Sequence, residues 1–170
     1  MQEEKLISLI INRLDKRARA QLEIVCQEDF SIKSVPQKKI FFDYHQIGLI
    51  QVPISLIHDL YNFQKDPWID WILTGISYQI NFIFDINEYV LSFVPWKMLI
   101  QWPICFQIAG NSVVAFKTKL IKREDLFLLK NQSFLVKTSQ QQFTAEAFEL
   151  VKQKKITIVE RTDESCIWGK

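Results

Sequence analysis

The chain has 170 residues, of which 48% are hydrophobic and 24% are charged, and its formal net charge is +2. That length is enough for one domain with a sizeable core, and this composition excludes wholesale disorder. The small net charge does not by itself indicate a nucleic-acid or membrane partner.

The cysteines and the longest uncharged stretch bear on the compartment. Cys26, Cys105 and Cys166 form no CxxC pair, and the first two lie in apolar runs where buried free thiols are expected. Residues 98–116 include glutamine, proline, glycine and asparagine, which do not suit a membrane-spanning helix. The acidic start of the chain is unlike a signal peptide. We therefore expect a soluble, intracellular protein that makes no membrane contact.

The first 64 residues predict one helix, three short strands and a second helix. Leucine and isoleucine at helical spacing predict a helix from about Glu3 to Arg17. Apolar runs predict strands over 21–26, 39–44 and 47–52. Pro53 ends the last strand, and the helix after it has an apolar face made of Ile54, Ile57, Leu60 and Tyr61.

The next segment combines a strong helix start with an alternating run. Asp66 and Pro67 are a typical N-cap and first helical residue, and Gly75 is placed to end that helix. Apolar and polar side chains alternate over 76–85, which is the period of a half-buried strand.

The alternating run is followed by three more predicted strands, over 89–94, 104–109 and 113–120. Gly110–Asn111 is a typical turn between the last two. Four strands in succession predict an antiparallel β-meander.

The last third predicts a short helix over 122–129 and then a strand–helix–strand unit over 133–138, 143–155 and 156–160. A connection of this length implies a parallel pair with a right-handed crossover. The fold class is therefore mixed α/β. We expect residues 1–64 to pack on a mixed-sheet core at 65–162, with a tail at 163–170, in one compact domain overall.

The sequence excludes phosphate-binding loops and favours structural roles for its other polar candidates. Its four glycines are scattered singly, so neither a Walker loop nor a GxGxxG turn exists, and we expect no cofactor. The two histidines, His45 and His58, are in no zinc pattern. Asp66 and Asp70 could ligate Mg²⁺, but capping of a helix is favoured. Cys26 with either histidine is a weaker candidate for nucleophilic catalysis.

Basic and aromatic residues are unevenly distributed. Between Gly110 and Lys155 there are nine basic and four acidic residues, an excess of +5 that leaves −3 for the rest of the chain. Such a cluster can contact phosphates, and the alternative is a set of solvated helix faces. Trp68, Trp71 and Trp96 lie with Trp102 in a ring-rich segment, which predicts a core with an exposed Trp-rich patch for a partner.

The last third also resembles a known family. The segments that carry the resemblance are 134–139 (FLVKTS), Phe143-Thr144 with Ala147, and 156–160 (ITIVE). They are similar to the Mrr-type restriction endonuclease domain of the PD-(D/E)XK nucleases. The resemblance implies a restriction-endonuclease-like core.

The catalytic part of that family is not retained. Its nuclease strand pairs Glu or Gln with Lys two residues later, and here Lys117 is kept but Ala115 replaces the metal ligand. The neighbouring strand, 104–106, has no aspartate, and without these oxygen ligands Mg²⁺ has no site. Asp85 is the only substitute carboxylate at a strand end.

Three hypotheses follow. The first is a non-catalytic nuclease-like subunit or adaptor that contacts DNA or RNA through Lys117, Lys119, Lys122 and Arg123. The second is an active Mg²⁺-dependent endonuclease with a migrated active site, using Asp85 and Lys117. The third is a purely structural subunit that binds another protein, or a second copy, through the Trp-rich surface. Catalysis is left open, and its absence is favoured.

Overall fold

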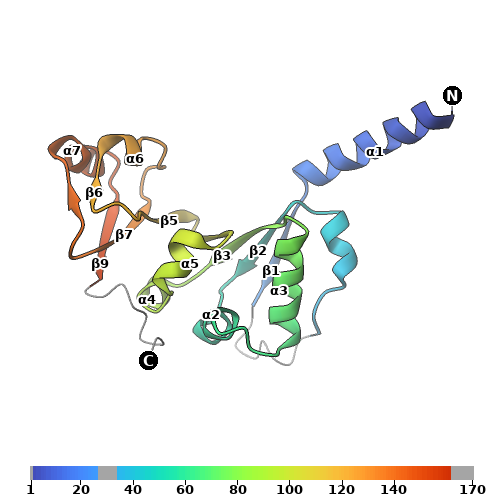
Figure 1. Cartoon of the computed structure of the whole chain (residues 1–170), viewed down its shortest axis with the longest axis horizontal. Helices are drawn as coiled ribbons and strands as arrows, with labels where there is room; N and C mark the ends of the chain where they lie inside the picture. Colours follow the sequence, from blue (N-terminus) through green and yellow to red (C-terminus); the bar gives the residue numbers. More distant parts are fainter. Residues whose placement is uncertain (1, 27–33, 162–170) are drawn as a thin grey trace.

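The computed structural model describes residues 2–26 and 34–161, which form a mixed α/β structure around one seven-stranded sheet. Its strand order is β1-β2-β3-β4-β5-β7-β9 (Figure 1). The strands are β1 (Gln21–Val25), β2 (Gln46–Ile50), β3 (Asn81–Asp85), β4 (Ile104–Ile108), β5 (Asn111–Ala115), β7 (Phe134–Thr138) and β9 (Thr157–Arg161). The predicted α/β class is confirmed, and the sheet is mostly parallel.

Strands β1 to β4 are parallel neighbours, β5 runs antiparallel to β4, and β7 and β9 are parallel to β5. Helical segments connect the strands, and β6 with β8 makes a second, two-stranded sheet. These elements are α1 (Gln2–Arg19), the 3₁₀ helix η2 (Lys38–Phe42), α2 (Ile54–Tyr61), α3 (Pro67–Ser77), α4 (Glu88–Leu91), α5 (Trp96–Gln101), β6 (Leu120–Ile121), α6 (Arg123–Phe127), β8 (Gln142–Phe143) and α7 (Ala145–Gln153).

The predicted antiparallel meander is wrong, and only its last hairpin is confirmed, with Ala109–Gly110 as its two-residue turn in place of the predicted Gly110–Asn111. Helix α3 continues to Ser77, so the strand is confined to 81–85. The segment predicted as a return strand begins with α4, because the Asn87 side chain accepts a hydrogen bond from the Tyr89 backbone N–H and starts a helical turn. Residues 39–44, predicted as a strand, overlap η2.

Large rings fill the first of two hydrophobic clusters, as expected. Phe41, Phe82 and Phe84 are fully buried beside Trp71. Gly75 lies inside α3 and does not end it; a Cβ there would lie 2.6 Å from the Phe82 ring, so the glycine allows helix and strand to approach closely.

The second cluster fills the C-terminal part, where the predicted strand–helix–strand unit is confirmed as β7-α7-β9 with a parallel pair. Residues 1–64 and 65–162 do not form separate sheets, since β1 and β2 pair with β3 in one sheet. The predicted tail at 163–170 lies outside the described residues. Of the helices described, none combines the length and the apolar character needed to cross a membrane.

Candidate functional site

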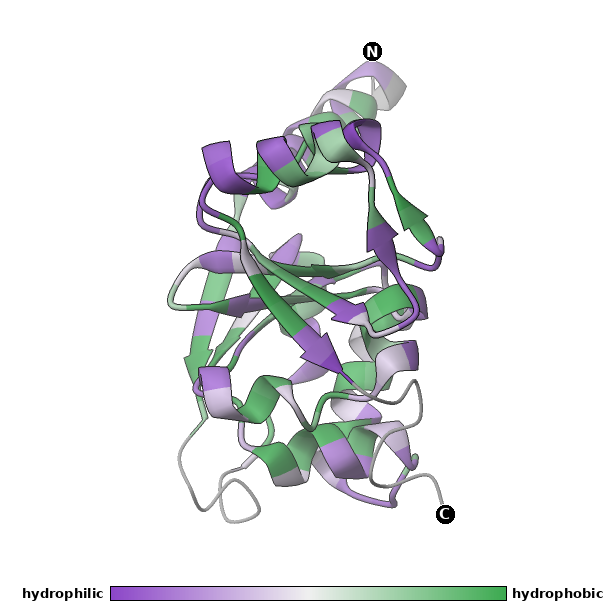
Figure 2. Cartoon of the chain, turned by 90° about the vertical axis from the view of Figure 1, so that its left-hand side faces the viewer, coloured by the Kyte–Doolittle hydropathy of each residue, from purple (hydrophilic) through white to green (hydrophobic). Residues whose placement is uncertain are grey.

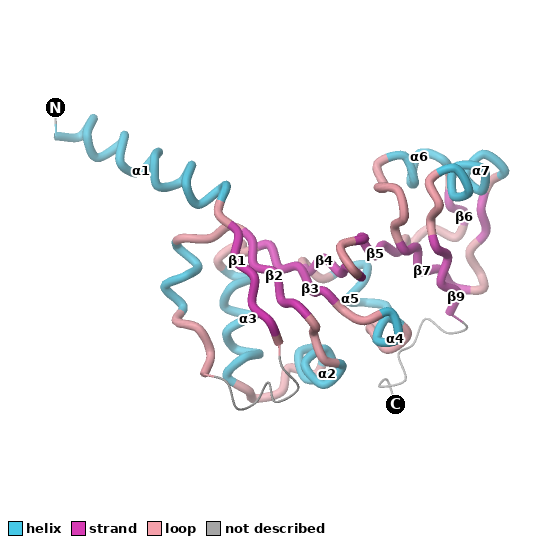
Figure 3. The backbone as a smooth tube through the Cα atoms, turned by 180° about the vertical axis from the view of Figure 1, so that it is seen from behind, coloured by secondary structure: helices cyan, strands magenta, loops and turns pink. Residues whose placement is uncertain are grey.

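Helix α1 projects from the rest of the chain (Figures 1 and 3). Its large apolar side chains are exposed. Every described side chain from Glu4 to Lys16 is exposed. At 100° per residue, the aliphatic side chains other than Leu9 fall within an arc of about 140°. Figure 2 shows hydrophobic and hydrophilic residues interleaved along this helix. The exposed fractions are 59% for Leu6, 56% for Ile7, 66% for Leu9, 50% for Ile10, 52% for Ile11 and 55% for Leu14.

Arg13 and Arg17, in the second half of α1, attach the helix to the body. The Arg17 guanidinium donates to the backbone carbonyls of Tyr78, at 2.9 Å, and Tyr44, at 3.3 Å. Arg13 makes an ion pair of 3.4 Å with Asp43, and both side chains are at least half exposed. A solvated ion pair of this kind contributes little, so Arg17 is the main anchor.

The apolar face of α1 continues into a groove at its base. Ile10 and Leu14 line a cavity of 480 Å³ together with Phe41, Phe42 and Tyr78. Phe42 and Tyr78 pack edge to face at 5.5 Å, yet remain 52% and 44% exposed. Helix and groove therefore form one continuous apolar surface, which we call the α1 surface (Leu6, Ile7, Ile10, Leu14, Phe42 and Tyr78).

A second candidate lies at the carboxyl ends of the four parallel strands. A cleft of 1020 Å³ opens there, and its lining residues follow or end strands β1 to β4. Asp85 contributes a carboxylate whose Oδ1 is buried and has no hydrogen-bond partner. Burial raises the pKa of Asp85; the Ala109 backbone hydrogen bond opposes this shift and the negative charge of Glu23 adds to it. We call this site the carboxyl-edge cleft.

The structure does not bring Asp85 and Lys117 together. Asp85 pairs in register with Gln107, and Gln107 pairs with Ser112 across the β4–β5 hairpin. From that level β5 runs toward the amino ends of β1 to β4, and Ala115, at its end, is already about 10 Å away along the strand. Lys117 lies beyond it, so the two residues proposed for a migrated active site lie toward opposite edges of the sheet.

The predicted nucleic-acid contacts are spread over two places. Lys117 and Lys119 line a cavity of 420 Å³ together with Lys97. Lys122 and Arg123 begin α6, where the Lys122 backbone N–H donates to Asp125.

Two other lysines of the basic segment have structural roles. Lys137 pairs with Glu160, and Lys154 donates to the backbone carbonyls of Leu126, Phe127 and Leu129. These two lysines, which contribute to the +5 charge excess, therefore stabilise the C-terminal half of the chain.

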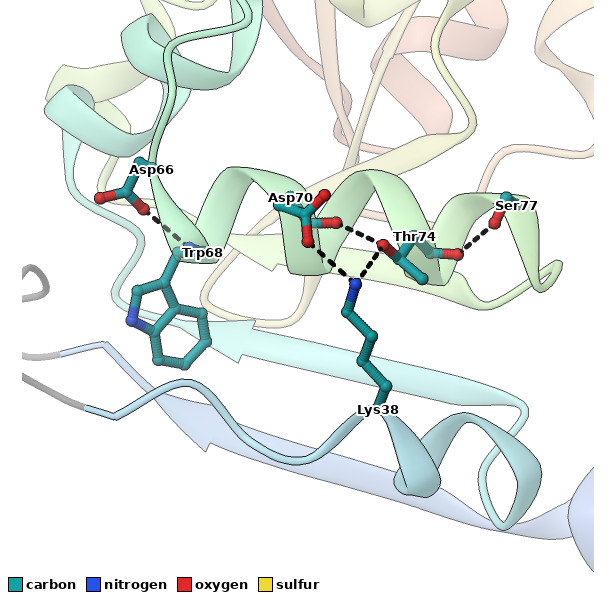
Figure 4. A network of polar contacts seen from close by, with 6 residues as sticks. All are labelled: Lys38, Asp66, Trp68, Asp70, Thr74 and Ser77. Carbon is teal, nitrogen blue, oxygen red and sulfur yellow. Dashed lines mark hydrogen bonds and ion pairs between the residues drawn. The ribbon is translucent and has the colours of Figure 1, made fainter.

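The Asp66–Asp70 pair serves helix α3, as the capping interpretation predicts (Figure 4). Asp66 accepts from the Trp68 backbone N–H at 2.7 Å, and Asp70 pairs with Lys38 at 2.9 Å. In the part of the chain that the structure describes, no three His, Cys, Asp or Glu side chains gather as a metal site would require.

The thiol and tryptophan predictions need correction. Cys26 is buried as expected, but Cys105 is exposed because the alternation along β4 turns it away from the core. His58 pairs with Asp59, and neither histidine is among the residues lining the cleft beside Cys26. Trp68, Trp71 and Trp96 are at most 7% exposed, so these three rings do not form the predicted partner surface. Trp102 is half-buried against Tyr61 and Phe63.

Sequence reasoning singled out Asp85 but not the cleft around it, and it missed the α1 surface. The helix between 67 and 77 and the helical turns between 88 and 101 separate β2, β3 and β4, and a strand–helix alternation of this kind would have indicated a parallel sheet with a carboxyl edge. No local sequence signal indicates that the apolar face of α1 is exposed, because a helix whose apolar face is covered has the same periodicity.

A comparison with protein families found a match over residues 5–157 to a family described as "putative propanediol utilisation". The searches of curated proteins and of solved structures found no match.

Proposed function

Because the chain belongs to the family described as "putative propanediol utilisation", we propose that it is an interaction subunit in propanediol utilisation that assembles through helix α1. The observation that carries this proposal is the α1 surface, whose four aliphatic side chains on the helix, Leu6, Ile7, Ile10 and Leu14, are each at least half exposed. Fully burying one such side chain stabilises by about 1.5–3 kcal/mol. A partner that covers this face therefore gains considerable binding energy.

The partner that we propose is a second copy of the chain, with the two α1 helices antiparallel. Glu4 lies near the start of α1, whereas Arg13, Lys16, Arg17 and Arg19 lie in its second half. Antiparallel pairing brings the acidic end of each helix beside the basic end of the other. The same patch then serves on both copies, which gives a closed two-fold dimer.

The apolar positions fit the same arrangement. Ile7, Ile10 and Leu14 recur at intervals of three and four, the spacing of a helix–helix seam. In an antiparallel pair Ile7 of one copy faces Leu14 of the other, with Ile10 near the two-fold axis. The partner's N-terminal half then reaches the groove beside Phe42 and Tyr78.

Light scattering during size-exclusion chromatography tests the proposal. The intact chain is expected to have twice the mass of one chain at micromolar concentration, and Ile10→Glu is expected to be a monomer. Asn12→Glu adds the same charge on the polar side of α1 and should leave the dimer intact. An intact chain that is a monomer at high concentration contradicts self-association. If that monomer binds anionic lipid vesicles, the exposed face of α1 is a membrane-binding surface and not a dimer interface.

Nucleic-acid contact through the basic segment is a second candidate, supported by the convergence of Lys97, Lys117 and Lys119 on one cavity. Changing Lys117, Lys119, Lys122 and Arg123 to alanine should weaken binding to DNA or RNA and flatten its salt dependence. The matched control replaces Lys5, Lys39, Lys65 and Lys130. Equal affinity of the two variants, or no binding at low salt, counts against this candidate. The restriction-endonuclease-like core stays a prediction, and the separation of Asp85 from Lys117 gives endonuclease activity no support.

A further inference from the structure

We infer that the carboxyl-edge cleft binds a small organic ammonium compound, with the Asp85 carboxylate as its anchor. This inference is independent of the α1 surface, which lies elsewhere on the chain and shares no lining residue with the cleft. It rests on the position of the cleft, on an unsatisfied buried oxygen, on the sign of the surrounding charge and on the apolar floor.

The cleft occupies the position where open α/β sheets hold their ligands, outside the carboxyl ends of parallel strands. Its floor is fixed by backbone hydrogen bonds that continue past the strands. Val52 donates to Asp85 and Ile86 donates to Gln107, each at 2.9 Å, and Cys26 donates to Ile50 at 2.8 Å. The site is therefore formed before any ligand arrives.

Asp85 supplies a hydrogen-bond acceptor that the protein leaves unused. Its Oδ1 is buried without a partner, although a backbone hydrogen bond from Ala109 reaches the carboxylate. A buried carboxylate oxygen without a donor is costly, and a ligand N–H would remove that cost. The raised pKa of Asp85 has the same origin, since desolvation disfavours the charged form.

The charges around the cleft select for a cation. Among the described residues that line it there is no lysine, arginine or histidine, whereas both Asp85 and Glu88 are acidic. Glu23 adds negative potential at Asp85. Phosphates and carboxylates are therefore repelled, and an ammonium group is attracted.

Apolar groups can hold the rest of such a molecule. Val52, Ile86 and Ile108 line the cleft and are at most 7% exposed. Tyr89 lines it too, with 84% of its surface exposed, so its ring is free to turn toward a bound cation. The ligand class is thus an amine that carries a short alkyl body.

Two strained residues border the same cleft. Gln51 and Ala109 follow β2 and β4 with φ of 58° and 47°, a left-handed conformation that non-glycine residues seldom adopt. At Ala109, which forms the β4–β5 turn with Gly110, the two-residue hairpin itself requires a positive φ. At Gln51 the strain is of the kind that tends to persist where a binding site requires it.

Titration of the intact, ¹⁵N-labelled chain with three related probes tests the inference. The probes are 1-amino-2-propanol, 1,2-propanediol and lactate, which share a three-carbon skeleton and are cationic, neutral and anionic. We expect 1-amino-2-propanol to shift the amide signals of Asp85 and Ala109 with millimolar affinity, and the other two to bind at least about tenfold more weakly. Asp85→Asn should weaken amine binding by about tenfold or more, while Glu149→Gln, an exposed carboxylate on α7, should not.

Asp85→Asn is expected to fold. Desolvation raises the folded-state pKa of Asp85 above its unfolded value, so the ionised carboxylate disfavours the folded state at neutral pH. The free energy of unfolding should rise as the pH falls through that raised pKa, and the variant should lack this contribution. Thermal unfolding between pH 4 and 7 checks it.

Three results would overturn the inference. One is equal affinity for the amine and the neutral diol, which would remove the role of charge. Another is preferential binding of lactate. The third is amine binding that Asp85→Asn leaves unchanged, or no shift of cleft amides by any probe.

Discussion

Helices α1 and α7 are both amphipathic, yet only one of them has its apolar face covered. In α7, Ala147, Leu150 and Val151 are at most 7% exposed and pack in the C-terminal cluster. In α1, Leu6 to Leu14 present aliphatic side chains that are at least half exposed. Periodicity in a sequence therefore predicts a face, but it does not predict what covers that face.

The connections of the two helices explain the difference. Helix α7 lies between the parallel strands β7 and β9, and a right-handed crossover returns it onto the sheet. Helix α1 precedes β1, an edge strand, and only Ala20 separates the two elements. Such a short connection does not let α1 turn back over the sheet, and the helix points away from the body (Figure 3).

The largest expected difference is between the substitution of a leucine in α7 and the substitution of a leucine in α1. Leu150→Ala should lower the free energy of unfolding by about 2–5 kcal/mol, because it leaves a cavity under α7. Leu14→Ala should change it by less than about 0.5 kcal/mol when the chain is dilute enough to be monomeric. Urea unfolding at low protein concentration measures both. Similar losses for the two variants would show that α1 is covered within one chain.

A smaller effect is expected at the start of α7. The Thr144 side chain accepts a hydrogen bond from the Ala147 backbone N–H, so Thr144→Ala should destabilise the fold by about 1 kcal/mol. Thr144→Ser keeps the acceptor and serves as the control. If both variants lose the same stability, the contribution comes from the methyl group and not from the cap.

The smallest effect is expected at the surface ion pair beside α1. Arg13→Ala removes the ion pair with Asp43. The free energy of unfolding, measured by thermal unfolding, should fall by less than about 0.5 kcal/mol. Arg17→Ala removes two bonds to backbone carbonyls and should loosen α1 more, as faster amide exchange at its C-terminal end. A larger loss from Arg13 than from Arg17 would reverse the assignment of the anchor.

Local signals in the sequence predicted local structure well. The Asp66–Pro67 start of α3, the β4–β5 hairpin at Gly110 and the β7-α7-β9 unit are confirmed, because each depends on residues close together in the chain. The parallel pairing of β1 to β4 was not predicted, because it joins strands that are far apart in the sequence. The alternating run over 76–85 predicted a longer strand than β3, which spans Asn81–Asp85. The site at Asp85 could be suspected from sequence, whereas its neighbours Gln51 and Ala109 are brought to it only by that pairing.

The β4–β5 hairpin divides the large sheet into two groups of strands that point in opposite directions. It is the one antiparallel pair among the described neighbours of that sheet. The carboxyl ends of β1 to β4 lie along one edge, and those of β5, β7 and β9 lie along the other. A molecule bound at the carboxyl-edge cleft therefore leaves the opposite edge, near Lys117 and Lys119, free for a different partner. The ligand proposed for the cleft and the nucleic acid proposed for Lys117 and Lys119 would therefore meet opposite edges of the sheet, and neither would block the other.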